Sequence, residues 1–287
     1  MTTDDKTGVQ PLLARPRDIL AMATSSDPWS PAVTAAIALA ARWASNLTSC
    51  YIEPSLRQVG GADLEPSALG LLLQPRGDDG GERAAFASHA HRLGVREAVW
   101  TVTHAGLAPT LRRLGAWHDL AVLERDMVEG AHLFDILGEA MLTSRIPCLL
   151  LPPGRDDEQL LLDRVAIGWN GGIEAVRAIH SALPFLQAAK EVLLIDGTPP
   201  GADDAEEKVP RFDPLNYLLR HNVMVRSRQI QVPPHLAGAT LLKEAQGMHA
   251  NLLVVGAYSH SRLRERVLGG ATRHMLLHAE IPVLMQH

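Results

Sequence analysis

Short, continuous apolar runs alternate with longer segments of helical periodicity along most of the chain. In the second half, runs rich in Val, Ile and Leu predict strands at 165–169, 191–196, 223–230, 251–256 and 282–286. Between them, apolar residues at helical spacing predict helices at 172–187, 213–221, 235–248 and 270–279. Strands that are apolar throughout are typical of a parallel sheet covered on both faces. The pattern therefore predicts a doubly wound α/β fold.

Three landmarks of this pattern occur twice, in the same order and roughly 130–150 residues apart, as expected for two copies of one unit. The similar pairs are 17–23 with 164–169, 119–123 with 251–255, and 145–151 with 280–285. Pro152-Pro153-Gly154 ends the first copy, and the polar stretch after it suits a short linker. We therefore expect two tandem five-stranded parallel-sheet domains. Their expected boundaries are a flexible N-terminus at 1–16, a first domain at 17–154, a linker at 155–162 and a second domain at 163–287.

The first copy contains weaker signals than the second. Residues 60–73 and 74–82 predict a loop or insertion ahead of a helix near 82–93, and 197–211 predicts a loop in the second copy. Ser25-Ser26-Asp27 is typical of a helix N-cap and predicts a helix from about Pro28.

Composition narrows the class of protein. The 46% hydrophobic and 21% charged residues describe a globular chain, and the net charge of −5 gives no support for nucleic-acid binding. The polar N-terminus predicts no signal peptide, and no apolar stretch is long enough to predict a membrane span. Cys50 and Cys148 lie in apolar runs and are expected to be buried, reduced thiols, which indicates the cytoplasm.

A glycine-bounded basic loop follows the predicted strand at 251–256. Gly256 begins the loop, and Gly269-Gly270 opens the next predicted helix. Glycines let the backbone approach an anion, and the first N–H groups of a helix point toward it. The loop also supplies possible counter-charges for a phosphate, namely His260, Arg262, Arg264 and Arg266. These arginines fit a solvated loop face equally well.

The chain resembles the universal stress protein family, and in particular its tandem bacterial members. The family hallmark is glycine, two residues, glycine, nine residues, glycine, then serine or threonine; here the spacing runs Gly256, Ser259, Gly269. The stretches 167–172 and 281–284 are also similar to the family's first and last strands of a domain. Ser259 stands for a glycine, Gly270 for a hydroxyl residue, and Asn170 for an acid. The first two departures weaken the expected phosphate binding.

The resemblance implies an adenine nucleotide, ATP or AMP, in the second domain, with Mg²⁺ accompanying a triphosphate. Near adenine and ribose it places Asn170 and Ile195. Near the phosphates it places Gly256, Ser259, His260, Gly269, Gly270 and Ala271, with Thr272 replacing the missing hydroxyl. It also implies a stress-response role without dedicated catalysis, an intramolecular pseudo-dimer and a possible homodimer. Two other functions stay open: an interaction scaffold that binds no nucleotide, and a small ATP-hydrolysing enzyme.

The corresponding stretch of the first copy, 124–130, lacks the paired glycines and carries three acids. Because these acids repel phosphate, we expect this domain to have lost the phosphate site. Elsewhere, His274 and His278 share a helix face, and a solvated or interface pair is favoured over a metal site. Trp169 adjoins the predicted cleft, where filling the core is favoured over stacking on a base.

Overall fold

The structure is a computed structural model that describes residues 15–57, 80–130, 132–154, 160, 162–198, 213–257 and 270–287. Its strands form one ten-stranded sheet in the order β3-β2-β1-β4-β5-β10-β9-β6-β7-β8. The strands of the N-terminal half are β1 Asp18–Ala23, β2 Asn46–Ile52, β3 Ala98–Thr103, β4 Leu120–Glu124 and β5 Cys148–Leu151. Those of the C-terminal half are β6 Arg164–Trp169, β7 Glu191–Asp196, β8 Val225–Gln229, β9 Leu252–Gly256 and β10 Val283–Gln286.

Each half is a doubly wound parallel unit, as the apolar runs predict. Counted from its own first strand, each half has the order 3-2-1-4-5, and every pairing inside a half is parallel. The fold class inferred from sequence is therefore confirmed, with β7 at the predicted residues 191–196. The predicted strand at 223–230 is shorter in the structure, because β8 is an edge strand with mostly exposed side chains.

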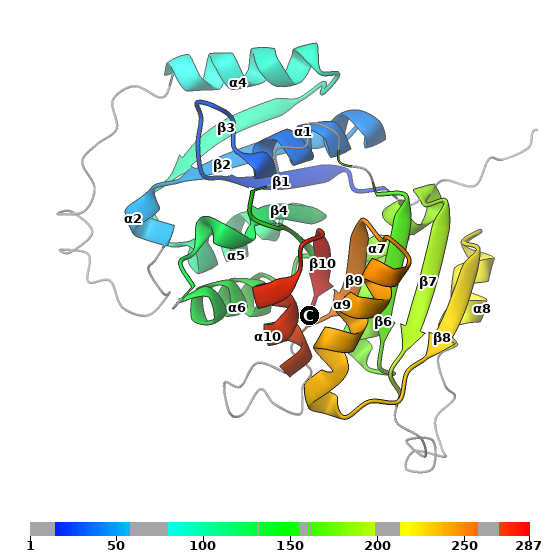
Figure 1. Ribbon diagram of the computed structural model, residues 1–287. Coiled ribbons are helices and arrows are strands. Elements are labelled where there is room, and N and C mark those ends of the chain that lie inside the picture. The colour runs from blue at the N-terminus through cyan, green and yellow to red at the C-terminus, as the bar shows by residue number, and fades with distance from the viewer. Residues whose placement is uncertain are drawn as a thin grey trace, which may run out of the picture.

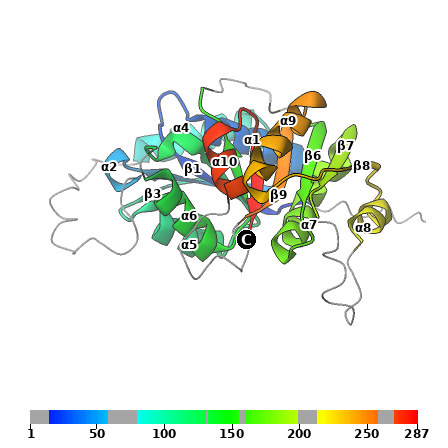
Figure 2. The ribbon, with the colours of Figure 1, turned by 60° about the horizontal axis from the view of Figure 1, so that its bottom comes forward.

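The two halves join edge to edge through β5 and β10. This pairing is antiparallel, with Leu284 opposite Leu149. Antiparallel pairing of equivalent strands relates the halves by an approximate twofold axis, as the repeat predicts. Figures 1 and 2 show the halves side by side along one sheet, β1–β5 in blue to green and β6–β10 in light green to red.

Helices cover both faces of the sheet. One face carries α1 Pro31–Trp43, α4 Gly80–Arg92, α7 Ile173–Ala188 and α8 Pro214–Arg220. The other carries α2 Pro54–Arg57, α5 Leu107–Gly115, α6 Leu133–Ser144, α9 Ala237–Gly247 and α10 Gly270–His278. Two 3₁₀ turns, η1 Arg125–Met127 and η2 Pro234–Leu236, complete the described elements. Each core contains side chains from both halves, and the rings of Trp43 and Phe185 meet edge-on with centroids 4.9 Å apart.

Two predictions about the N-terminal half need correction. Helix α1 begins at Pro31, with Ser30 at the N-cap, rather than near Pro28. The reason is that Asp27 and Pro28 form a tight turn, closed by a bridge between Ser26 and Trp29, before the chain enters the helix. The predicted helix near 82–93 is α4, which starts two residues earlier. The predicted loop at 60–73 lies outside the described residues, as do most of 74–82, most of 197–211 and most of the linker.

Candidate functional site

The candidate site lies at the carboxyl ends of β6 and β9, where the strand order of the C-terminal half reverses. Strand β6 pairs with β7 on one side and β9 on the other. In open α/β sheets the helices leaving such strands diverge to opposite faces and open a crevice at this point. Asn170 directly follows β6, Gly256 ends β9, and α10 starts at Gly270. The fold therefore brings Asn170, Gly256 and the start of α10 to one edge of one sheet.

Asn170 shapes the tight turn between β6 and α7. Its Oδ1 accepts a hydrogen bond of 3.0 Å from the Gly172 N–H. Gly171 has φ +77°, a conformation that a side chain disfavours, and Gly172 is the N-cap of α7. An aspartate at position 170 would make the same turn. Asn170 thus keeps the turn and an exposed polar group at the strand end without adding a negative charge.

At the end of β7, Asp196 lies closer to the sheet edge than the predicted site residue Ile195. Ile195 is 0% exposed and belongs to the core, so its side chain does not reach the sheet edge. Asp196 lies opposite Trp169, is only partly buried, and accepts a 2.8 Å hydrogen bond from the Thr198 N–H through Oδ1. Asp196 is the polar group that the sequence analysis missed. Its signal was the first acid after the buried run 192–195.

Gly256 is required by packing. A Cβ at this position would lie 2.5 Å from the Ala175 nitrogen and 2.5 Å from the Glu174 carbonyl carbon. The first turn of α7 therefore sits directly against the end of β9, and only glycine leaves room for it. Its φ is outside the left-handed region, so conformational freedom is not the reason. This contact explains the glycine without any bound ligand.

Residues 258–269 lie outside the described part of the chain, so Ser259, His260, Gly269 and the loop arginines stay predictions. The start of α10 is described. Gly270 is exposed, with no atom within 4 Å of a Cβ built there. Thr272 is 5% exposed and packs inward.

Ala271 packs against α9. A Cβ on Gly238 would lie 3.0 Å from the Ala271 Cα and 2.7 Å from the His274 Cβ, so the two helices touch at a glycine. Of the three residues predicted at the helix start, Gly270 alone has no neighbouring atom of the described residues within 4 Å of its Cβ position, whereas Ala271 packs against α9 and Thr272 is buried.

The N-terminal half fills its equivalent edge with Glu124. Equal register of β4 against β1 and of β9 against β6 places Glu124 where the C-terminal half has Gly256. Glu124 is 7% exposed, and its carboxylate accepts hydrogen bonds from the Thr24 hydroxyl at 2.9 Å and the Ala32 N–H at 3.1 Å. Burial raises the pKa of this carboxyl above its ordinary value of 4.5, outweighing the hydrogen bonds that lower it.

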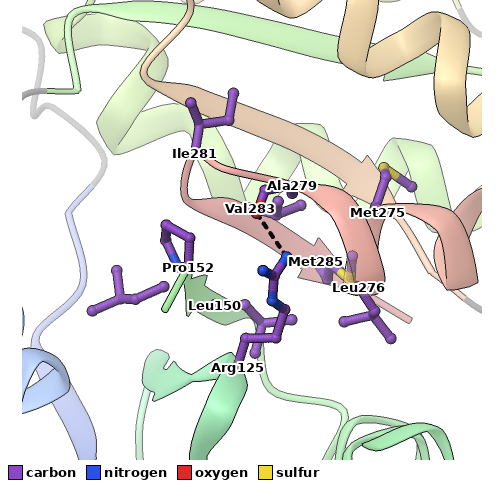
Figure 3. Close-up of a pocket in the computed structure, with 10 residues that line it drawn as sticks. Arg125, Leu150, Pro152, Met275, Leu276, Ala279, Ile281, Val283 and Met285 are labelled. Carbon is purple, nitrogen blue, oxygen red and sulfur yellow. Dashed lines mark hydrogen bonds between the residues drawn. The ribbon is translucent and has the colours of Figure 1, made fainter. Parts of the chain in front are cut away.

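A small crevice lies at the junction of the halves, beneath α10. Its walls are apolar except for Arg125, and they come from the ends of β5, β10 and α10. The Nη1 of Arg125 donates a 2.6 Å hydrogen bond to the carbonyl oxygen of Ala279, just after α10 (Figure 3). Burial lowers the pKa of this guanidinium, while Asp126 and Glu280 raise it. This crevice is part of the joint between the halves.

Two further expectations concern single side chains. Trp169 is 7% exposed and lies in the core, as favoured from sequence. The ring centroids of His274 and His278 lie 4.4 Å apart. The pKa of His274 is lowered mainly by burial and to a smaller extent by the nearby His278. Within the described residues, no three His, Cys, Asp or Glu side chains gather in a way that would hold a metal ion. None of the described helices is long and apolar enough to cross a membrane.

The fold and the edge at β6 and β9 define a tandem doubly wound α/β protein with a candidate ligand site in its C-terminal half. Residues 163–287, which make up the C-terminal half, match the model of the Universal stress protein family. No curated protein matches the chain.

Solved structures share the whole architecture. A universal stress protein from Archaeoglobus fulgidus DSM 4304 aligns with a TM-score of 0.63 at 11% identity, over 94% of this chain and 98% of its own. A putative universal stress protein from Pseudomonas aeruginosa UCBPP-PA14 aligns with a TM-score of 0.63 at 14% identity, over 94% and 92%. At this identity the likeness shows the fold alone. It extends that fold to the N-terminal half, which the family model does not match.

Proposed function

We propose that this chain is a cytoplasmic stress-response protein whose C-terminal half binds an adenine nucleotide, ATP or AMP, without dedicated catalysis. The observation that carries the proposal is the spacing Gly256, Ser259, Gly269, which starts at the carboxyl end of β9 where the strand order reverses. The family match covers the same residues.

The described residues fit the chemistry of such a ligand. Asn170 and Asp196 offer polar oxygens at the ends of adjacent strands, suited to ribose hydroxyls or the adenine amino group. Gly270 leaves open space at the start of α10, where backbone N–H groups attract phosphate. Mg²⁺ would accompany a triphosphate through the phosphate oxygens. The domain limits 17–154 and 163–287, and a further homodimer, belong to the same proposal.

Nucleotide retention and stabilisation test the proposal. Nucleotide extracted from the purified protein should be adenine-based, and millimolar ATP or AMP should raise the unfolding temperature, since a ligand that binds only the folded state stabilises it. The Gly269→Val variant should keep its fold and lose this response. A parent protein with no retained nucleotide and no stabilisation by ATP, ADP or AMP would contradict nucleotide binding.

The departures from the family spacing favour a second candidate, an interaction scaffold that binds no nucleotide. Ser259 adds a side chain where a glycine is expected, and Gly270 lacks a hydroxyl. The Ser259→Gly/Gly270→Ser double variant should bind ATP more tightly than the parent if these residues limit binding. Absence of binding in both proteins would favour the scaffold. Turnover of ATP well above background, lost in Gly269→Val, would favour an enzyme.

A further inference from the structure

Both halves bury a glutamate at the ligand edge of the sheet, but the glutamate comes from a strand in one half and from a helix in the other. Glu124 ends β4 in the N-terminal half, and Ala32 is the second residue of α1. In the C-terminal half the equivalent strand ends in Gly256, and the second residue of α7 is Glu174. Both glutamates are buried, with 7% and 5% exposure. Each half thus buries a glutamate where its first helix meets its fourth strand, from the strand in the N-terminal half and from the helix in the C-terminal half.

Packing explains why the glutamate comes from different elements in the two halves. In the C-terminal half the first turn of α7 lies so close to β9 that no side chain fits at position 256. In the N-terminal half the connection from β1 to α1 is seven residues, 24–30, against three, 170–172, from β6 to α7. Here the strand end carries a glutamate whose side chain extends to the start of α1. Only the N-terminal half therefore fills its strand end with a charged group.

Several donors converge on the Glu124 carboxylate. Oε1 accepts from the Ala32 N–H, which is at the open end of the thirteen-residue α1, and Oε2 accepts from the Thr24 hydroxyl. The Ser30 hydroxyl is a third hydrogen-bond partner. The Arg57 guanidinium donates to the carbonyl oxygens of Thr24 and Ile52 and interacts electrostatically with Glu124. Backbone and hydroxyl donors at a helix start, with a cation beside them, form an anion-binding arrangement.

We propose that Glu124 is a built-in occupant of this anion position: its carboxylate takes the place of an external carboxylate or phosphate group and closes the N-terminal half to anionic ligands. Glu124 is then a residue that distinguishes the two halves, because the equivalent position in the C-terminal half, Gly256, carries no side chain. This inference does not depend on nucleotide binding by the C-terminal half.

Chemical rescue tests the proposal. Truncation in Glu124→Ala leaves the donors of Thr24, Ser30 and Ala32 around a space that a small carboxylate can enter. Sodium formate should raise the unfolding temperature of this variant more than sodium chloride of equal ionic strength, and the rise should grow with formate concentration. The parent and Glu124→Gln, whose side chains still fill the space, should respond equally to both salts. A formate response in Glu124→Ala no larger than that of the parent would overturn the proposal.

A second variant tests the donors directly. Glu124→Ala/Thr24→Val also removes the Thr24 hydroxyl, which donates to the carboxylate in the parent, so formate should raise its unfolding temperature less than that of Glu124→Ala. An equal formate response in the two variants would overturn the proposal. If Glu124→Ala does not fold in chloride, formate should restore its folding, and failure to restore it would likewise overturn the proposal.

Discussion

Arg125 Nη1 lies 2.6 Å from the carbonyl oxygen of Ala279, so a cation from the N-terminal half caps the end of α10 in the C-terminal half. The last carbonyls of a helix have no partner within it, and a positive charge there is favourable. The residues are 154 positions apart in sequence. This bond connects α10, which begins at the candidate site, to the opposite half of the molecule.

Replacing Arg125 should loosen the joint between the halves. Arg125→Ala removes the charged donor and part of the crevice wall, and should lower the free energy of unfolding by about 1.5–3 kcal/mol, the range for a hydrogen bond to a charged group. Urea unfolding measures the loss, and hydrogen exchange should rise in the last turn of α10. Arg113→Ala, which truncates an exposed arginine of α5, is the control and should stay close to the parent. Equal behaviour of the two variants would contradict a capping role.

Gly256 should not tolerate even a methyl group. Gly256→Ala places a Cβ within 2.5 Å of the backbone of α7, so strand and helix must separate. We expect a loss of about 1–3 kcal/mol in the ligand-free protein, typical of overpacking. Gly247→Ala at the end of α9 is the matched control, because a Cβ there has no atom within 4 Å. If Gly256→Ala unfolds at the same urea concentration as the control, the glycine serves a ligand instead of the packing.

The buried Glu124 should give stability a definite pH dependence. Its pKa is raised in the folded state by burial, so the folded protein binds a proton more readily than the unfolded chain. The stability from this proton is fully present below the ordinary value of 4.5 and is lost as pH rises through the folded pKa. Because the glutamine side chain does not titrate, the Glu124→Gln variant does not lose this stability as pH rises.

The unfolding free energy of Glu124→Gln should therefore increase relative to the parent as pH rises above 4.5. Urea unfolding at several pH values measures the difference. The exposed Glu97→Gln variant controls for loss of one negative charge. A difference that falls as pH rises would mean that the folded protein favours the ionised carboxylate.

Both thiols should be inert in the native protein. Cys50 and Cys148 are free and buried, and burial raises the pKa of each to about 12. Since the thiolate is the reactive form, neither should react with a disulfide reagent at neutral pH, while both should react in denaturant. The number of protein thiols that have reacted, followed over time, measures this difference. Rapid reaction of one thiol in the folded protein would show that its strand opens.

Sequence patterns predicted the elements of the C-terminal half closely, but did not separate buried from exposed positions at the strand ends. Strand β7 was predicted at its observed residues, because a buried parallel strand must be apolar throughout. Ile195 was expected at the ligand edge, although the buried part of the strand includes it and the polar edge starts at Asp196. Because helices cover both faces of the sheet, the side chains of residues 192–195 are all buried, and the side chain becomes partly exposed at the last residue of the strand, Asp196.

Two different causes can explain the glycine at position 256. Its spacing from Gly269 indicates a phosphate loop, whereas the structure shows that the first turn of α7 occupies the space of a side chain. Sequence spacing cannot separate these causes, because the contact joins residues about 80 positions apart that only the sheet brings together.

Periodicity, the repeated landmarks and the glycine spacing were enough to specify two doubly wound units and the family of the second, because each of these signals is local along the chain. The antiparallel joining of β5 to β10, the cap from Arg125 to Ala279 and the burial of Glu124 at the start of α1 emerged only in the folded molecule. These features depend on distances and on exclusion of water between segments far apart in sequence, and on the register of the sheet that sets them side by side.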